Sequence, residues 1–207
     1  MRILALVVLA GCSWTGIRGS GNAKTEVRTV PAFSAIDLTG SVDAEIAAGP
    51  EAHVEISGDD NIVPLVTTDV HGDRLEIGTR QSIRPNVKLL ARITLPRLTA
   101  IDLTGSGDIT ARGLQADHLA IGLGGSGNIR ADGTAHDLEI DVRGSGDIAF
   151  GQLAAERARV SVSGSGDVDV SAARALDVSI SGSGDVTYHG DPELKKHVSG
   201  SGSVVKK

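Results

Sequence analysis

Aromatic residues are almost missing from this chain, whose 207 residues include one tryptophan, one tyrosine and two phenylalanines. A core must therefore be built from valine, isoleucine, leucine and alanine, which favours thin, regular layers of strands over a bulky globular centre. The net charge of −6 excludes the basic surface that binding to nucleic acid requires. The single cysteine excludes an intrachain disulfide.

That cysteine stands in an informative place near the N-terminus. An apolar run at residues 3–10 is too short to span a bilayer as a helix and is typical of the hydrophobic region of a signal peptide. The Leu-Ala-Gly-Cys sequence that ends at Cys12 resembles the lipobox of bacterial lipoproteins, in which the cysteine is lipidated. A buried N-terminal strand with a chance cysteine is the alternative. We therefore predict a lipoprotein signal peptide at residues 1–11 and a lipid anchor on Cys12, with the membrane as its partner.

The next segment, residues 12–24, lacks any apolar period and is predicted to be a tether. Ser13 follows the cysteine. By resemblance to bacterial lipoproteins, a residue other than aspartate at the position after the cysteine implies sorting to the outer membrane. We expect an exported protein that is lipid-anchored in the cell envelope, at the outer membrane.

Internal repetition is the strongest signal in the rest of the chain. The sequence PAFSAIDLTGSVD at residues 31–43 recurs as PRLTAIDLTGSGD at residues 96–108. This duplication predicts two related β modules, an N-terminal module at residues 25–98 and a C-terminal repeat module at residues 99–207.

A shorter repeat runs through the second module. Gly-Ser pairs recur every 18 to 20 residues, beginning at Gly105, Gly125, Gly144, Gly164, Gly182 and Gly200. A period near 19 residues fits one coil of a solenoid, in which stacked neighbours bury a continuous core. Because identical direct repeats stack in parallel, we predict an all-β, β-helix-like solenoid with coils of about 19 residues. An antiparallel β-sandwich is the alternative.

The phase of the apolar alternation indicates what the glycines do. Val160 and Val162 share a parity with Gly164, Gly166 and Val168, and the residues between them are polar. A slip of one residue would turn every later side chain to the other face. The glycines are therefore predicted to occupy inward positions of a bent strand, where there is no room for a side chain.

The residue after each Gly-Ser-Gly forms a second series, which we call the Asp ladder. In stacked coils its members would lie about 4.8 Å apart, so that like charges repel unless water or a cation screens them. A hydrated polar ladder and a weak cation or ligand site are the two interpretations. The ladder comprises Asp108, Asn128, Asp147, Asp167 and Asp185.

Candidate catalytic and cofactor motifs lack the neighbouring secondary structure or the residue spacing that their chemistry requires. The GLGGSG sequence at residues 122–127 formally satisfies a dinucleotide fingerprint, but a strand and turn pattern follows it instead of a helix. The histidines have no metal-ligand spacing, and the serines lie in regular series instead of on a nucleophile elbow. We predict no catalytic residue, no metal site, no cofactor and no enzymatic activity.

Taken together, these segments resemble a bacterial family described as "putative auto-transporter adhesin, head GIN domain". The resemblance covers residues 19–207 and rests on residues 19–46, on ISGDDNIVPLV at 56–66, on the GSGD repeats and on the ending at 188–207. It implies a right-handed parallel β-helix-like solenoid in an exported protein, often a lipoprotein, with adhesion implied by analogy.

Our leading hypothesis is therefore a membrane-anchored, non-enzymatic β-solenoid lipoprotein that adheres to a surface or binds a partner. One alternative is a glycan-binding or polysaccharide-processing β-helix. A second alternative is an envelope scaffold or sensor partner. The partner expected beyond the membrane is a glycan or an envelope protein, and no nucleic acid.

Overall fold

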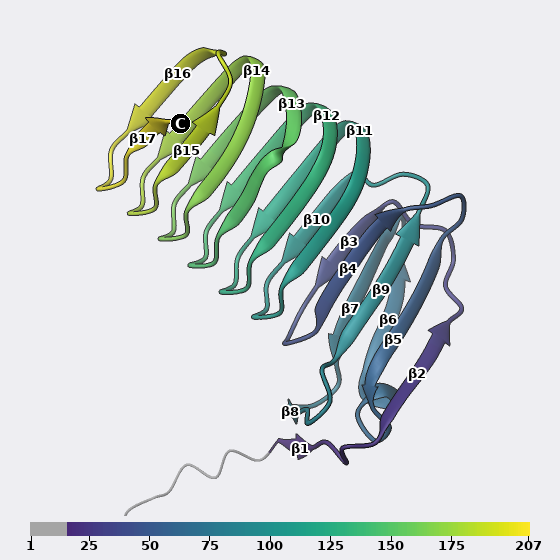
Figure 1. The fold of residues 1–207 in the computed structure, drawn as a ribbon. Helices are drawn as coiled ribbons and strands as arrows, with labels where there is room; N and C mark the ends of the chain where they lie inside the picture. Colours follow the sequence, from purple (N-terminus) through teal and green to yellow (C-terminus); the bar gives the residue numbers. More distant parts are fainter. Residues whose placement is uncertain (1–15) are drawn as a thin grey trace, which may run out of the picture.

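The computed structural model describes residues 16–207, most of which lie in β-strands (Figure 1). From residue 100 onward the strands form a β-solenoid of about five turns in which every pairing is parallel. The solenoid prediction is confirmed, and the parallel pairing rules out the antiparallel sandwich. The strands are β10 (Ala100–Leu103), β11 (Ile109–Leu123), β12 (Ile129–Val142), β13 (Ile148–Val162), β14 (Val168–Ile180), β15 (Val186–His189), β16 (Glu193–Val198) and β17 (Val204–Lys206).

Each coil is a flattened loop with two sheet faces. Residues 119–123 of β11 pair with the end of β12 and, with their equivalents in other coils, form what we call the first face. Residues 109–111 of β11 pair with the start of β12 and, with their equivalents, form the second face. The register shifts between Ala111 and Leu114, where β11 bends around the coil without leaving the sheet.

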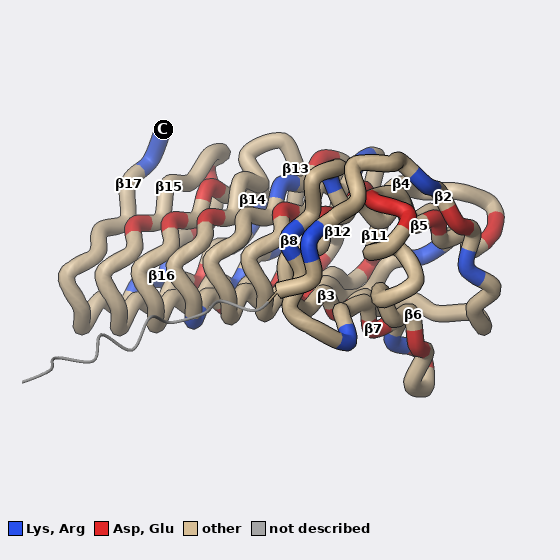
Figure 2. Tube along the Cα trace, turned by 90° about the horizontal axis from the view of Figure 1, so that it is seen from below, with Lys and Arg blue, Asp and Glu red and all other residues tan. Residues whose placement is uncertain are grey.

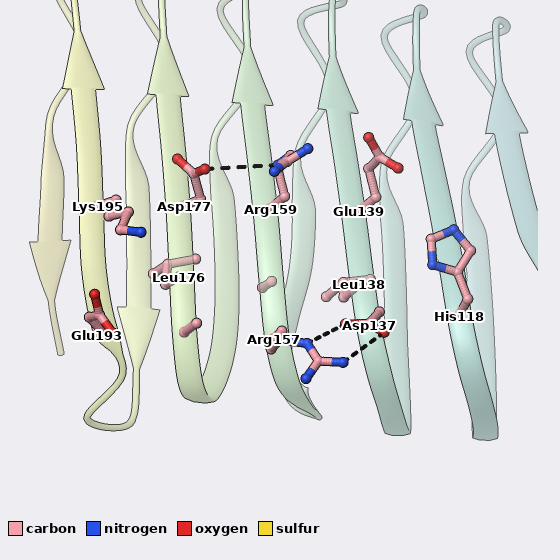
Figure 3. A pocket seen from close by; sticks show the side chains of 12 residues that line it. His118, Asp137, Leu138, Glu139, Arg157, Arg159, Leu176, Asp177, Glu193 and Lys195 are labelled. Atoms are coloured by element: carbon pink, nitrogen blue, oxygen red, sulfur yellow. Dashed lines mark hydrogen bonds and ion pairs between the residues drawn. The ribbon is translucent and has the colours of Figure 1, made fainter.

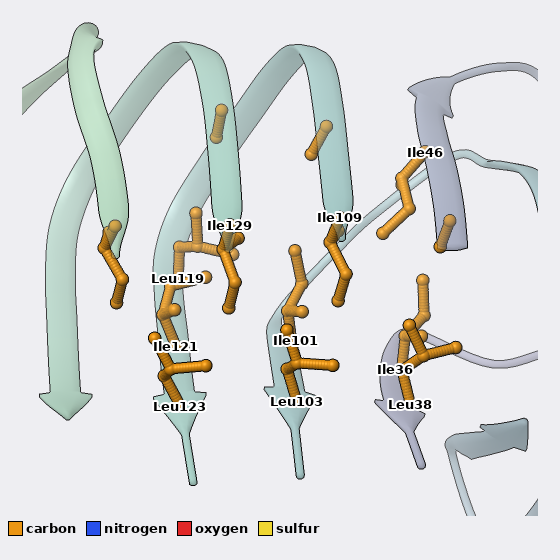
Figure 4. Packing of buried hydrophobic residues seen from close by; sticks show 14 of the residues in the cluster. Ile36, Leu38, Ile46, Ile101, Leu103, Ile109, Leu119, Ile121, Leu123 and Ile129 are labelled. Carbon is orange, nitrogen blue, oxygen red and sulfur yellow. The ribbon is translucent and has the colours of Figure 1, made fainter. Parts of the chain in front are cut away.

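The hydrophobic core lies between the two faces (Figure 4). Ile101, Leu103 and Ile121 come from the first face and Ile109 and Ile129 from the second, and each is at most 2% exposed. Branched aliphatic side chains at every second position suit both the strand backbone and the narrow space between the faces. Burial of each such side chain contributes about 1.5–3 kcal/mol.

The Gly-Ser-Gly segments are turns that join the first face to the second. β10 ends at Leu103 and β11 begins at Ile109, so the prediction that the glycines continue a bent strand is wrong. The lack of room for a side chain is confirmed, because an added Cβ on Gly127 would lie 1.8 Å from the carbonyl oxygen of Gly107. This Cβ would meet the turn of the preceding coil, so the glycine is required by backbone stacking along the solenoid.

Residues 16–95 fold onto the N-terminal end of the stack, and most of their strands belong to the same 15-stranded sheet. β6 and β7 form an antiparallel hairpin, and β5 pairs antiparallel with both β2 and β9. The elements are β1 (Ile17–Arg18), β2 (Ala23–Arg28), β3 (Ala35–Leu38), β4 (Asp43–Ala48), β5 (His53–Asp59), the 3-10 turn η1 (Val63–Leu65), β6 (Val66–His71), β7 (Arg74–Thr79), β8 (Ile83–Arg84) and β9 (Leu90–Leu95).

The two copies of the long repeat are neighbours in the stack. β3 pairs in parallel with β10, which places Asp37 beside Asp102, and β4 pairs with the start of β11. The long insertion of β5 to β9 separates these coils in the sequence but not in space. The module boundary predicted near residue 98 falls between β9 and β10, and the sheet runs across it.

Residues 16–24, the described part of the predicted tether, pack against the N-terminal end of the fold, with β1 paired to β8. Asp59 is fully buried beneath them and accepts backbone N–H groups from Gly21 at 2.7 Å, Asn86 at 2.9 Å and Val87 at 3.0 Å. Burial opposes ionisation of Asp59, but these N–H groups outweigh it and lower the pKa of the carboxyl below its ordinary value.

The predicted signal peptide at residues 1–11 and the predicted lipidation site Cys12 lie outside the described residues. Within residues 16–207, no helix has the length and apolar character needed to cross a membrane.

Candidate functional site

The outward side chains of the first face form rows of charge along the solenoid axis, which we call the charged face. Parallel pairing places Glu139 beside Arg159, Arg159 beside Asp177 and Asp177 beside Lys195. Strand spacing sets these neighbours about 4.8 Å apart. The row therefore alternates in sign from one coil to the next.

A groove of about 430 Å³ opens on this face (Figure 3). Leu138, Ala158 and Leu176 lie beneath it, with side chains that point into the core and are at most 5% exposed. Ala175 is the short side chain in its row, between Arg157 on one side and Glu193 on the other. The surface is thus hollowed where Ala175 replaces a longer side chain, with charged side chains around the hollow.

The most tightly paired charged groups in the groove are the side chains of Asp137 and Arg157. Arg157 donates from Nε to Asp137 Oδ1 at 2.7 Å and from a terminal nitrogen to Oδ2 at 3.1 Å, a two-point contact. The same guanidinium is 2.8 Å from Nε2 of His136. The hydrogen bond from Arg157 lowers the pKa of Asp137, and the reciprocal bond raises the pKa of Arg157. This pair stays ionised throughout the physiological range.

The other charges around the groove are held less tightly. Arg159 Nε lies 3.9 Å from Asp177 Oδ2, a loose ion pair with both side chains more than half exposed. The side chains of Glu139 and Lys195 make no hydrogen bond or ion pair with any other residue within 16–207. These side chains are available to a charged partner, whereas the Asp137 pair is already satisfied.

The Asp ladder has a structural role at the Gly-Ser-Gly turns. Each side-chain oxygen accepts the backbone N–H of the equivalent residue in the following coil: Asp108 accepts from Asn128 at 2.9 Å, and Asp147 accepts from Asp167 at 3.0 Å. Asn128, Asp167 and Asp185 continue the pattern, and Asp43 and Ser203 extend it at the two ends. Consecutive acidic positions align along the stack (Figure 2).

This bonding explains why aspartate and asparagine occur at the same ladder position. Both offer an oxygen to the next coil, so the series satisfies turn N–H groups that no strand pairs with. No group of three or more histidine, cysteine, aspartate or glutamate side chains that could hold a metal occurs in the part of the chain that the structure describes. The cation or ligand interpretation of the ladder stays a prediction.

The charged face was missed by sequence reasoning, although its signal was present. Aligning the repeats at their Gly-Ser pairs would have placed Glu139, Arg159, Asp177 and Lys195 in one row. The same alignment would have placed Ala175 between Arg157 and Glu193, so the repeats also indicated the short side chain that hollows the groove.

Three solved structures of bacterial proteins share this fold. A "putative adhesin" from Bacteroides fragilis has a TM-score of 0.75 at 25% identity and covers 93% of this chain and 100% of that chain. A "putative lipid binding protein" from Parabacteroides distasonis has a TM-score of 0.63 at 26% identity, with the same coverage. A "putative adhesin" from Parabacteroides merdae, at 20% identity with a TM-score of 0.58, covers 93% of this chain and 99% of that chain and supports the fold alone.

The search of curated proteins found no match. A family profile, in contrast, matches residues 32–192, which span the N-terminal coil and nearly all of the solenoid. The match includes both copies of the long repeat and all but one of the Gly-Ser-Gly turns of the solenoid. The chain therefore belongs to the family described as "Putative auto-transporter adhesin, head GIN domain".

Proposed function

We propose that this protein is a non-enzymatic adhesion module that binds a charged surface or partner through the charged face. The observation that carries the proposal is the row of Glu139, Arg159, Asp177 and Lys195, which alternates in sign at strand spacing beside a groove. Membership of a family described as putative adhesins, and the Bacteroides fragilis structure described in the same way, support it.

The physical basis of this adhesion is rigid display. Backbone pairing between coils fixes the spacing of the strands that carry the charged side chains, so no backbone entropy is lost when a partner binds several of them together. An alternating array favours a partner whose charges alternate with the same spacing and disfavours one of uniform sign. Each exposed contact is weak, and strength comes from their number.

We also propose that the module is exported and held in the cell envelope, at the outer membrane, by a lipid on Cys12. The lipobox sequence and the short apolar run before it support this anchor. Residue 16, where the described chain begins, lies at the N-terminal end of the stack, away from β16 (Figure 1). An anchor before it would attach at the end of the stack opposite to β16 and leave the charged face on the side of the solenoid.

A small-ligand function is a second candidate, favoured by the groove of about 430 Å³ on the charged face, a volume within the range of ligand sites. The Parabacteroides distasonis structure described as a "putative lipid binding protein" makes an acyl chain the first ligand to test.

Adhesion is tested with beads coated with the protein and held under flow on cells of the expressing bacterium and on mucin. The Arg159→Ala, Lys195→Ala double variant should lose most of the retention, because it removes the positive members of the row. Retention should also fall as salt is raised, since exposed charges are screened over about 8 Å at 0.15 M. Thr187→Ala, on the second face, is the control.

Equal retention of the double variant and the wild type would refute the role of the charged face. Saturable release of sugars from a polysaccharide would refute the non-enzymatic function. The anchor is tested separately with Cys12→Ala, which should move the protein from the membrane fraction to the soluble fraction. Unchanged membrane partition would refute lipidation.

A further inference from the structure

A second groove lies on the second face, on the other side of the core from the charged face. It runs across β11 to β15 and has a volume of about 480 Å³, which falls within the ~300–1,000 Å³ of small-molecule sites. Its lining combines charged and polar side chains with alanine and glycine, and it contains no phenylalanine, tyrosine or tryptophan. We call it the β13 groove, after the strand that forms its floor.

The floor is low because β13 carries Ala149 and Gly151 at its outward positions. Ala149 lies in register between Arg130 of β12 and Asp169 of β14, which places those two backbones two strand spacings, about 10 Å, apart. A Cβ added to Gly151 would lie 2.6 Å from Asp169 Oδ2 and 3.2 Å from His189 Nε2. The missing side chain therefore makes room for these two polar groups over the strand.

The two walls of the groove differ in charge. On one wall, Asp169 Oδ1 lies 2.7 Å from His189 Nε2, so this carboxylate is paired and its second oxygen faces Gly151. On the other wall, the guanidinium groups of Arg112 and Arg130 make no hydrogen bond or ion pair with any other residue within 16–207. Asp132 follows Arg130 by two residues in β12, and its Oδ1 accepts the N–H of Gly113 of β11 at 2.7 Å.

Such walls select a ligand with two kinds of group. Unpaired guanidinium groups bind carboxylates by two parallel hydrogen bonds. A carboxylate such as that of Asp169 accepts hydrogen bonds from hydroxyl groups and repels anions. The ligand must therefore carry its negative charge at one end and hydroxyl donors at the other. Neutral sugars lack the charge, and the groove has no aromatic ring on which they could stack.

We propose that the β13 groove binds a carboxylate-bearing sugar of the uronic acid class. Arg112 and Arg130 bind the sugar carboxylate, and Asp169 and His189 bind its hydroxyl groups. This site uses no residue of the charged face, so it stands or fails independently of the adhesion proposed above. The same protein would then contact a charged surface with one face and an acidic glycan with the other.

The test is calorimetric titration of the full chain with trigalacturonate, with galactotriose and inorganic phosphate as comparison ligands. Trigalacturonate should bind saturably, and galactotriose should not. Arg130→Ala should raise the Kd about tenfold, as expected for loss of one partly exposed charge-assisted hydrogen bond. Arg97→Ala, an exposed arginine in the loop before β10, should leave the Kd unchanged.

Asp169→Asn separates sugar recognition from simple anion binding. It should weaken trigalacturonate binding, because the amide is a poorer acceptor for hydroxyl groups, and it should not weaken phosphate binding. Circular dichroism confirms that each variant is folded. The proposal is overturned if the wild type does not bind trigalacturonate, if Arg130→Ala binds it as tightly as the wild type, or if phosphate binds equally well.

Discussion

Replacing Gly146 by alanine tests whether the turns stack as closely as the structure requires. The new Cβ would lie 1.8 Å from the carbonyl oxygen of Gly127, whereas a carbon and an oxygen in ordinary contact are about 3.3 Å apart. The two turns must separate by roughly 1.5 Å, which breaks the hydrogen bond from Ser145 N to Gly125 O, 3.0 Å long. The lost turn hydrogen bonds and the overpacking together should destabilise the fold by about 3–4 kcal/mol.

The assay is unfolding in urea followed by far-ultraviolet circular dichroism. With a denaturant dependence of about 2 kcal/mol per molar urea, the unfolding midpoint of Gly146→Ala should fall by about 1.5–2 M. Gly124→Ala is the matched control, because its Cβ would meet only the Thr104 methyl group, at 3.2 Å, which can rotate away. Similar midpoints for both variants and the wild type would refute close backbone stacking as the reason for the repeated glycines.

Three further predictions concern the core, the N-terminal end and the Asp ladder. Phe150→Ala should lower the free energy of unfolding by about 3–5 kcal/mol, because a fully buried ring leaves a cavity; a loss below 1 kcal/mol in urea unfolding would contradict its burial. Because the folded pKa of Asp59 is lowered, its stabilisation is complete above the unfolded pKa of about 3.9 and is lost as the pH falls through the folded value. Melting temperatures should therefore drop more steeply below pH 4 in the wild type than in Asp59→Asn, and parallel profiles would show that Asp59 is not the cause. Asp147→Ala should cost about 1 kcal/mol in urea unfolding and Asp147→Asn almost nothing, since only the former removes the acceptor for Asp167 N–H; equal losses would show that charge, not the hydrogen bond, matters there.

The Asp ladder and the glycines together explain how one short sequence can build a long stack. The glycines let successive turns approach closely, and the following Asp or Asn satisfies the N–H group that the turn leaves unpaired. Each coil thus carries both the space for its neighbour and the acceptor that its neighbour needs. Stability then accumulates coil by coil, as in other solenoids.

Much of the fold was predictable because it depends on local periodicity. The alternation of residues such as Val160 and Val162 predicts which side chains enter the core, and the spacing of the Gly-Ser pairs predicts one coil per repeat. The end of the strand at each Gly-Ser-Gly was not predictable. A turn that keeps the inward and outward parity of the flanking strands shows the same alternation of apolar and polar residues as a continuous strand.

The candidate sites were less predictable because they form across strands. Arg159 and Lys195 share a row because of the register between β13, β14 and β16, which only an alignment of whole repeats, and no single strand, could indicate. The β13 groove depends on Gly151 lying beneath Asp169 and His189, which come from two other strands. No motif within one strand records such a neighbourhood.

By itself, then, the sequence determined the all-β class, the period of the coil, the buried alternation and the need for glycine at each turn. These follow from the geometry of a single strand and from direct repetition along the chain. Only the tertiary structure decided that the two long repeats are adjacent coils, that the Asp ladder bonds turn to turn, and that two grooves lie on opposite faces. The physical reason is that these features depend on interstrand register and side-chain size across coils, which no local pattern encodes.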